Sequence, residues 1–526
     1  MFLKAFCGSA LLALSVAASP TLQLHWTGSR NLHADTNAAY LKTILDLPQS
    51  TTLKNQTLDK LALWLARAPG YPALQQSNTP ALFGAMVATN AAAKALRPLL
   101  DDLVEEESYF ELQSGTNGPT EFAMAVRLDP AQAALWETNL ASAFGPAPHL
   151  PFSLQPLAFS LRRAAPWTLV SLSSATNHPL LDALADRIQS AGANNPFTAS
   201  STTNFWVDLS LDFAQLSALW SSPKTPTLQH SNTPGLQQPN FPLVSLRAYG
   251  DGTDVHILGD ATFPRPLPLE LEPWNIPTNL IHDPLISFTA ARGFRPLLTN
   301  WPAWKSLQLP SSPNQVFVWA LRGVPIQDFA AAPLTNADGA VRVLGNDLMR
   351  FANAALAERR FGGFEFTNAD ELIWRGAPFI SPSVRSISDQ RGQVLLAGLV
   401  HLPEKGLVPP PELWNQVFSR TNLVYYGWEL TGPRLEQWLY LTQLARVLAH
   451  QPQMPPASPG LEWLDGAAPR FGNCITIVTD ANPQFLHITR RCKFGLTSIE
   501  FHVLVDWLES AAFPCGFHTL TAAPAN

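Results

Sequence analysis

Two neighbouring residues, His282 and Asp283, have side chains of the types that acid–base catalysis uses. A carboxylate can orient a histidine as a general base, and Arg292, further along the chain, can bind an anionic group. Glu429 is the best further carboxylate for a site assembled from distant residues. Asp283 precedes a proline, however, and Asp-Pro is equally typical of a turn that begins a strand. His282, Asp283 and Glu429 are therefore candidates for a hydrolase site, with the turn as the alternative.

Three other segments match known motifs only in part. Ser221 and Lys224 have the S-x-x-K spacing of penicillin-binding enzymes, but two nearby prolines indicate a loop, where the side chains cannot share a helical face. Residues 251–254 (Asp-Gly-Thr-Asp) offer carboxylates to calcium, yet a strand resumes at once, which favours a hairpin turn. The acidic run 105–107 is typical of a solvated helix end. The chain has no G-x-S-x-G, H-E-x-x-H, C-x-x-C, G-x-G-x-x-G or Walker motif, so the sequence predicts no metal site and no cofactor.

Once the N-terminal cysteine is set aside, three remain: Cys474, Cys492 and Cys515. Residues 474–479 and 485–492 have strand character and are joined by a turn sequence, so we predict a β-hairpin. If the hairpin is symmetric about Pro483, Cys474 faces Cys492. We predict a disulfide between these two, with buried free thiols as the alternative, and the sequence assigns no role to the third cysteine.

The first twenty residues have the three parts of a secretory signal peptide. Lys4 supplies a charged region, residues 5–17 form an apolar run, and small residues precede Ser19. The run is too short to span a bilayer, and no later segment reaches the roughly 18 apolar residues of a membrane helix. We predict cleavage near Ala18, an extracytoplasmic location (periplasmic or secreted) and a mature chain without a transmembrane segment. A short buried N-terminal helix is the alternative.

The composition indicates a large globular protein with few charges. Hydrophobic residues make up 46% of the 526 residues, enough to bury more than one core. Charged residues make up only 14%, and the 34 basic and 40 acidic residues form no long run of one sign. Because a nucleic-acid-binding protein needs a clustered basic surface, nucleic-acid binding is disfavoured.

Two strand-to-helix segments, 122–136 and 205–220, share one pattern. Each alternates apolar and polar residues over seven positions and then places Asp at the N-cap and Gln three residues on, a capping box. Looser copies cover 423–438 and 316–329. We interpret them as copies of a duplicated α+β module, with convergent use of common capping residues as the alternative.

Short returns between further strands favour antiparallel sheets over a doubly wound parallel sheet. Strands are predicted at 167–172, 244–248, 255–258, 285–288, 372–374 and 394–399, and helices at 37–45, 58–66, 91–104, 180–188, 346–359, 434–449 and 497–508. We expect Pro98 to break the third of these helices. The predicted fold class is α+β, with mainly antiparallel sheets covered by helices.

A proline-rich stretch marks the clearest domain boundary, because its prolines exclude a central strand or a helix interior. The expected organisation is a signal peptide (1–18), an N-terminal α+β domain (19–263), a linker (264–279), a C-terminal α+β domain (280–515) and a disordered tail (516–526).

The chain has 16 tryptophans, and exposed aromatic faces can stack on sugar rings. Four tryptophans lie on apolar helix stripes and are expected in the core: Trp136, Trp220, Trp438 and Trp507. Trp274, Trp301 and Trp304 lie in proline-rich segments and are the better candidates for exposed contacts with a carbohydrate.

Residues 34–39 (Ala-Asp-Thr-Asn-Ala-Ala), 57–61 (Thr-Leu-Asp-Lys-Leu) and 422–429 (Asn-Leu-Val-Tyr-Tyr-Gly-Trp-Glu) resemble segments of uncharacterised secreted bacterial proteins with repeated α+β units. The resemblance implies export and a duplicated fold, and it implies no activity. We expect an exported, non-enzymatic binding or assembly protein of the bacterial cell envelope, whose partner is an envelope protein or a glycan. An extracytoplasmic hydrolase and a tryptophan-mediated carbohydrate-binding protein are the alternatives.

Overall fold

The computed structural model describes residues 20–66, 81–113, 121–144, 158–173, 177–191, 204–220, 240–323, 326–358, 360–377, 379–389, 392–403, 406–448, 458–510 and 513–514. The chain divides into two compact units, of which the first comprises 1–264, 459–463 and 505–518, and the second comprises the remainder. The division after Pro264 lies at the start of the proline-rich stretch. The signal peptide, the S-x-x-K segment, Cys515 and the C-terminal tail lie outside the described residues.

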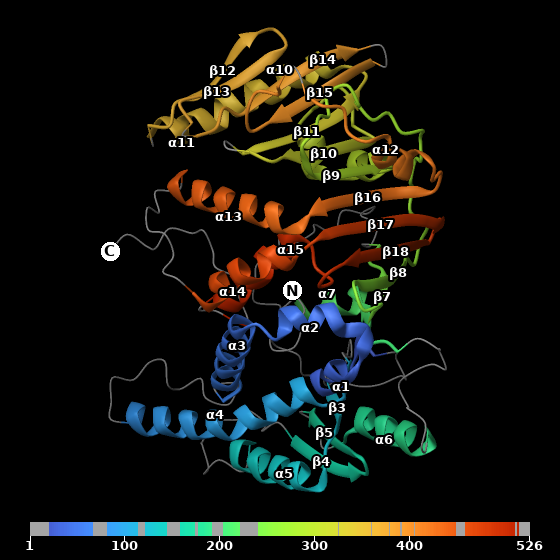
Figure 1. The fold of residues 1–526 in the computed structure, drawn as a ribbon, viewed down its shortest axis with the longest axis vertical. Coiled ribbons are helices and arrows are strands. Elements are labelled where there is room, and N and C mark those ends of the chain that lie inside the picture. The colour runs from blue at the N-terminus through green and yellow to red at the C-terminus, as the bar shows by residue number, and fades with distance from the viewer. Residues whose placement is uncertain are drawn as a thin grey trace. The chain divides into compact units, whose positions relative to one another are not determined.

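The first unit contains an antiparallel sheet whose described strands follow the order β4-β5-β3-β2-β1-β6-β7-β8 (Figure 1). These strands are β1 Leu22–Trp26, β2 Ser108–Gln113, β3 Glu121–Arg127, β4 Ala158–Ala164, β5 Trp167–Ser173, β6 Val207–Asp212, β7 Leu243–Gly250 and β8 Val255–Thr262. The helices are α1 Ser29–Ala34, α2 Ala39–Leu45, α3 Pro48–Ala66, α4 Ala81–Glu105, α5 Pro130–Phe144, α6 Pro179–Ala191 and α7 Phe213–Trp220, with a 3-10 turn η2 at Thr36–Ala38.

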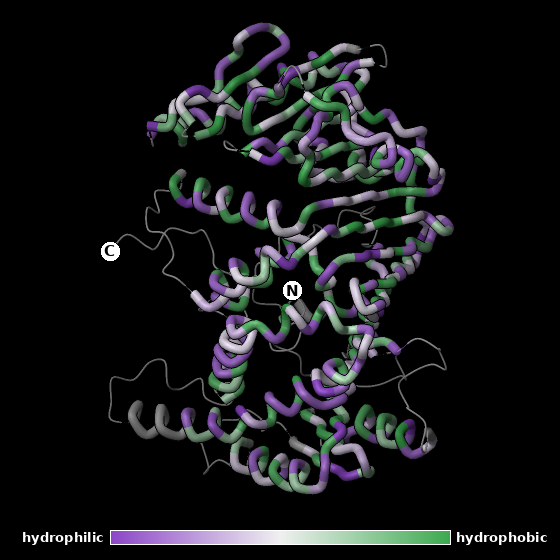
Figure 2. Tube along the Cα trace, viewed as in Figure 1, coloured by the Kyte–Doolittle hydropathy of each residue, from purple (hydrophilic) through white to green (hydrophobic). Residues whose placement is uncertain are grey.

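The two faces of this sheet are covered differently. On one face, Met124 and Val126 of β3 pack with Trp136 of α5 and with apolar residues of α3 and α4, which form a core. On the other face, α6 packs over Ala123 and Leu169 of β3 and β5. The alternation that places successive side chains on opposite faces of a strand accounts for both cores. Because both of its faces are covered, β3 carries the continuous apolar run Phe-Ala-Met-Ala-Val. Figure 2 shows hydrophobic residues along helices and strands of both units.

The second unit also contains an antiparallel sheet, with its described strands in the order β12-β13-β14-β15-β11-β10-β9-β16-β17-β18. These strands are β9 Leu285–Arg292, β10 Gln315–Leu321, β11 Gln327–Leu334, β12 Gly363–Asn368, β13 Glu371–Arg375, β14 Ser383–Asp389, β15 Gly392–Gly398, β16 Leu423–Leu430, β17 Asn473–Asn482 and β18 Phe485–Cys492. The helices are α8 Arg295–Asn300, α9 Pro302–Ser306, α10 Ala337–Asp347, a π-helical turn η4 Leu348–Ala352, α11 Asn353–Glu358, α12 Pro411–Phe418 and α13 Thr431–Leu448. The chain continues through α14 Pro459–Ala467, a 3-10 turn η5 Ala468–Arg470 and α15 Ser498–Glu509.

The strand orders of the two units coincide. Matching β9, β10 and β11 with β1, β2 and β3, and β14 to β18 with β4 to β8, gives the same neighbours in both sheets. The hairpin β12–β13 is an addition at one edge of the second sheet.

The α+β fold class with antiparallel strands is confirmed, as are the hairpins at 251–254 and around Pro483. The expected break at Pro98 is wrong, because α4 runs through this residue. Leu96, Leu99 and Leu100 hold this part of α4 in the core, and such packing can offset one lost backbone hydrogen bond.

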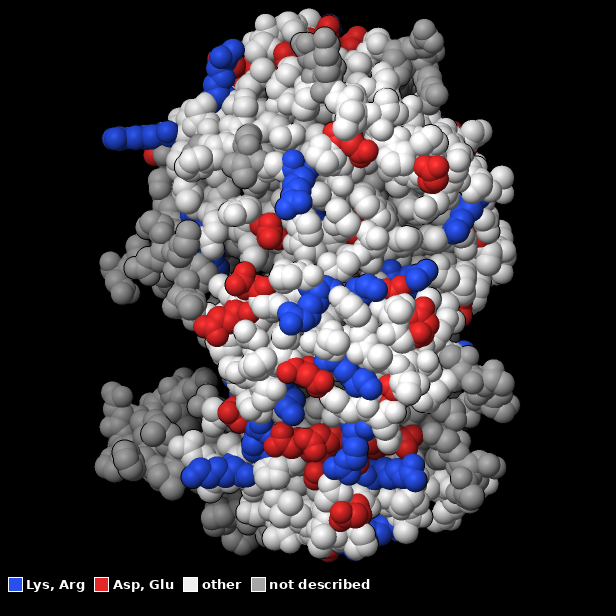
Figure 3. Space-filling model, viewed as in Figure 1, with Lys and Arg blue, Asp and Glu red and all other residues white. Residues whose placement is uncertain are grey.

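Charges lie unevenly on the face of the molecule that Figure 3 shows. Figure 3 shows acidic and basic side chains side by side in a band across the first unit, whereas much of the remaining visible surface carries no charge. In the part of the chain that the structure describes, no helix is both long and apolar enough to cross a membrane.

Candidate functional site

Asp283 holds the turn that begins β9. Its Oδ1 accepts a hydrogen bond from the Leu285 N–H at 3.2 Å, and its own N–H donates to the Leu407 carbonyl at 2.8 Å. The adjacent His282 is half-buried, and its Nδ1 has no hydrogen-bond partner among the described residues. The turn interpretation of Asp283 is therefore confirmed.

Glu429 holds the start of α15, because its carboxylate accepts hydrogen bonds from the Ser498 N–H at 2.6 Å and the Ser498 hydroxyl at 2.8 Å. In the sheet, Glu429 lies opposite Ser287. Asp283 lies two residues before β9, where its carboxylate bonds the turn. Each of the two carboxylates is therefore engaged in structural hydrogen bonds at its own element.

Arg292 is buried and binds backbone rather than an anion. Its guanidinium donates to the carbonyls of Leu423 at 2.8 Å, Thr421 at 2.6 Å and Glu272 at 2.6 Å. The group also lies over the Trp274 ring, 4.4 Å from its centroid. Burial lowers the pKa of Arg292. The predicted anion-binding role is therefore wrong, because these carbonyls take up the donors.

Cys474 and Cys492 are both buried, and both are free thiols in the structure. Ile475 and Arg491 form a cross-strand pair, and Cys474 and Cys492 are the residues next to them on the two strands. The predicted register is therefore confirmed. The hydrogen bond from the Cys474 thiol to Cys492 raises the pKa of Cys474 and lowers that of Cys492. The disulfide itself stays a prediction.

The tryptophans divide between core and surface. Trp136 and Trp507 are buried as expected, and Trp438 is half-buried under the Arg434 guanidinium. The side chain of Trp220 lies outside the described ones.

Of the three candidates for sugar contacts, only Trp301 is mostly exposed, at 56%. Trp304 donates to the Ser312 hydroxyl at 3.0 Å, and Trp274 packs against the core of the second unit. These three side chains therefore do not form a common exposed platform.

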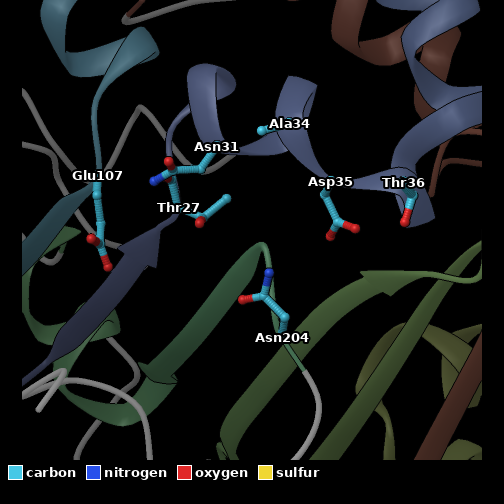
Figure 4. A pocket seen from close by; sticks show the side chains of 7 residues that line it. All are labelled: Thr27, Asn31, Ala34, Asp35, Thr36, Glu107 and Asn204. Atoms are coloured by element: carbon cyan, nitrogen blue, oxygen red, sulfur yellow. The ribbon is translucent and has the colours of Figure 1, made fainter.

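A polar hollow of about 500 Å³ lies at one end of the sheet of the first unit (Figure 4). Seven residues line it: Thr27, Asn31, Ala34, Asp35, Thr36, Glu107 and Asn204. Gly28, with φ +88°, allows the end of β1 to lie against the α4–β2 corner, because a Cβ atom there would meet the Glu105 carbonyl oxygen at 2.6 Å. This close approach brings Glu107 beside β1.

Glu107 is the buried carboxylate of this hollow. Its Oε1 lies 3.0 Å from Nε2 of the buried His25, and its Oε2 accepts a hydrogen bond from Arg127 at 3.2 Å. Burial alone would raise the pKa of Glu107, but the hydrogen bonds and charges of His25 and Arg127 outweigh burial and lower it. The prediction that the acidic run 105–107 is a solvated helix end is therefore wrong for Glu107.

A second hollow, of about 400 Å³, shares Asn31 and Glu107 with the first. Its other lining residues are Arg30, Glu106, Arg127, Leu128, Asp129, Gln132 and Pro166. Arg30 pairs with Glu106 at 2.6 Å. Asp129 caps α5 by accepting from the N–H groups of Ala131 and Gln132, which confirms the predicted capping interaction. The charges in this hollow are thus bound to other protein groups.

The polar character continues across the sheet from the first hollow. We call this surface the polar face, and it comprises six residues: Gln23 and His25 of β1, Tyr109 and Glu111 of β2, Asp208 of β6 and Arg247 of β7. Glu111, fully buried, accepts from Arg187 at 2.6 Å, Gln23 at 2.8 Å and Tyr109 at 2.9 Å. Burial, followed by the charge of Glu111, raises the pKa of Tyr109.

The exposed part of the polar face lies over β6 and β7. Asp208 and Arg247 are cross-strand neighbours, with Nε of Arg247 3.3 Å from Asp208 and side chains 49% (Arg247) and 33% (Asp208) exposed. The open hydrogen-bonding groups are therefore those of Asp208, Arg247 and the two hollows, while the buried Glu111 is engaged by its protein donors. Such a surface suits the binding of a polar ligand.

Comparisons with protein families, with curated proteins and with solved structures found no match for this chain. Within the described residues, no group of three or more His, Cys, Asp or Glu side chains is arranged to hold a metal ion. The candidate site therefore rests on its geometry.

Proposed function

We propose that the protein is an exported binding component of the bacterial cell envelope, and that its ligand site is the polar face with the two adjoining hollows. One observation carries this proposal: the buried carboxylate Glu107, which pairs with the buried His25 and the exposed Arg127, lines both hollows next to the polar face. Burying such charges costs folding free energy that apolar packing would not. A buried polar group is more informative about function than an exposed apolar one.

The lining of the hollows favours binding over catalysis. The lowered pKa of Glu107 makes its carboxylate a weak base near neutral pH. Asp35 accepts from the Trp206 indole N–H at 2.8 Å and from the Asn37 N–H at 2.8 Å, so its carboxylate is held by the protein. Groups fixed in this way position a ligand without exchanging protons with it.

Export rests on the N-terminal sequence, and it places Cys474 and Cys492 where disulfides form. Cleavage after Ala18 removes Cys7, and a disulfide would engage Cys474 and Cys492. Alkylation of the denatured, unreduced protein is then expected to label one thiol, Cys515. After reduction, three thiols react. Intact mass measures both numbers and the start at Ser19. Labelling of three thiols without reduction would show that the pair stays free.

The matching strand orders support a duplication, in which each unit descends from one α+β module. The similar segments 205–220 and 423–438 lie at matching positions, β6–α7 and β16–α13. The segments 122–136 and 316–329 do not occupy matching positions in full, since the second covers β10 and the start of β11. The proposed duplication therefore rests on topology and on one matched pair of segments.

Co-sedimentation with isolated envelope fragments tests the proposed function. The variant Asp208→Lys removes an acceptor carboxylate from the polar face and repels the Arg247 guanidinium from its position, so it is expected to weaken binding at least about tenfold. The matched control is Asp370→Lys, which changes an exposed aspartate in the second unit by the same charge. Absence of binding by the unaltered protein, or equal binding by Asp208→Lys and the control, would refute the proposal.

A further inference from the structure

Three aromatic rings form a row at the edge of the polar face. Tyr249 of β7 stacks on His256 of β8, with ring centroids 5.0 Å apart and an interplanar angle of 13°. Phe205, just before β6, meets Tyr249 edge-on at 5.9 Å and 79°. The Arg247 guanidinium lies over Phe205, 5.5 Å from the ring centroid. All three rings are half-buried, so each keeps part of its surface open to solvent.

This row adjoins the first hollow. Asn204, which lines the hollow, directly precedes Phe205 in the chain. The β7–β8 turn is bonded to the segment that follows Thr36 of the hollow, because the Gly252 N–H donates to the Asn37 carbonyl at 2.7 Å and the Tyr40 N–H donates to the Gly252 carbonyl at 3.1 Å. The row therefore begins one residue beyond a residue that lines the first hollow.

The carboxylates around the row are bound to neighbouring protein donors. Asp208 pairs with Arg247, and Asp251 lies 2.8 Å from Nε2 of His256. The hydrogen bond from His256, together with backbone N–H groups of the turn, lowers the pKa of Asp251. An anionic ligand would need an excess of cationic groups, and this surface does not supply one. Hydroxyl groups, in contrast, can donate to the carboxylates and accept from Arg247 and Asn204 without adding charge.

We propose that the row Phe205–Tyr249–His256 and the first hollow bind a neutral polyhydroxylated ligand, a glycan chain. The apolar C–H faces of sugar rings pack on the aromatic rings, and their hydroxyls bond the amide and carboxylate groups beside them. This inference rests on the proposed function and specifies its ligand class. The proposed sugar contacts are thus made by Phe205 and Tyr249 of the first unit, and not by the tryptophans of the second unit that the sequence suggested.

Calorimetric titration of the full mature protein with two neutral probes, the tetramer of N-acetylglucosamine and cellotetraose, tests the inference. At least one probe is expected to bind, and Tyr249→Ala is expected to weaken its binding about tenfold because a stacking surface is lost. Tyr249→Phe keeps the ring and should bind as the unaltered protein does. Tyr440→Ala removes a tyrosine that is 59% exposed in the second unit and serves as the matched control.

The outcomes separate this inference from the proposed function. If neither probe binds while envelope fragments still co-sediment, the glycan inference fails and the proposed function stands. If Tyr249→Ala and Tyr440→Ala bind the probe with equal affinity, the aromatic row is not part of the binding site. If neither the probes nor the envelope fragments bind, both proposals fail. Melting temperatures of the variants establish that a loss of binding is not a loss of fold.

Discussion

Arg292→Met is expected to lower the free energy of unfolding by about 3–5 kcal/mol, because three buried carbonyl groups lose their donors at once. Arg292 is only 3% exposed, and methionine fills similar volume without any N–H group. Arg292→Lys should be nearly as damaging, since one ammonium cannot reproduce the planar set of donors. Urea unfolding, monitored by tryptophan fluorescence, measures this change. The urea concentration at the midpoint of the second unit's transition should be lower in the variant.

Arg295→Met is the matched control for this experiment. Arg295 lies three residues away and pairs with Glu270 and Glu272, but its side chain is 37% exposed. A partly exposed ion pair contributes only about 0–1 kcal/mol. Equal losses in Arg292→Met and Arg295→Met would contradict the structural role assigned to Arg292.

Glu107→Gln is expected to lower the stability of the first unit by about 3 kcal/mol. The amide keeps the shape of the side chain but removes the charge that His25 and Arg127 share. Because Arg127 is more than half exposed, we expect the lower end of the range for breaking a buried pair. Glu105→Gln, at a more exposed position of the same acidic run, should cost less than about 1 kcal/mol.

The pH dependence of unfolding gives an independent check on Glu107. Its pKa is lower in the folded protein than the ordinary value of 4.5, so the unfolded chain binds the proton more tightly. The stabilisation is therefore complete above pH 4.5 and is lost as the pH falls through the folded pKa. In Glu107→Gln, the free energy of unfolding should fall less steeply as the pH is lowered below 4.5. An unchanged pH dependence would show that Glu107 is not ion-paired in the folded state.

Local chemistry accounts for the parts of the fold that the sequence predicts well. The turn after Asp480 and the alternation on both sides set the β17–β18 register, and Asp129 with Gln132 begins α5 as a capping box does. These signals lie within a few residues of each other in the chain. The α+β class follows from many such short-range patterns.

The candidate site was not predictable in the same way, because its partners are distant in the chain. Glu111 is bound by Gln23, which is 88 residues away, and by Arg187, which is 76 residues away. The alternation in β1, Leu-Gln-Leu-His-Trp, is also typical of a strand with one solvated face. The anion-binding prediction for Arg292 failed for the same reason, because two of its acceptors, Thr421 and Leu423, lie far beyond it in sequence.

Amide hydrogen exchange of the mature protein, with and without isolated envelope fragments, tests most directly whether the polar face is the binding surface. Bound ligand is expected to slow exchange in β1 and α1, in residues 204–212 and in the β7–β8 hairpin, because these segments carry the polar face, the first hollow and the aromatic row. Slowing confined to the second unit, with no change in these segments, would contradict the account.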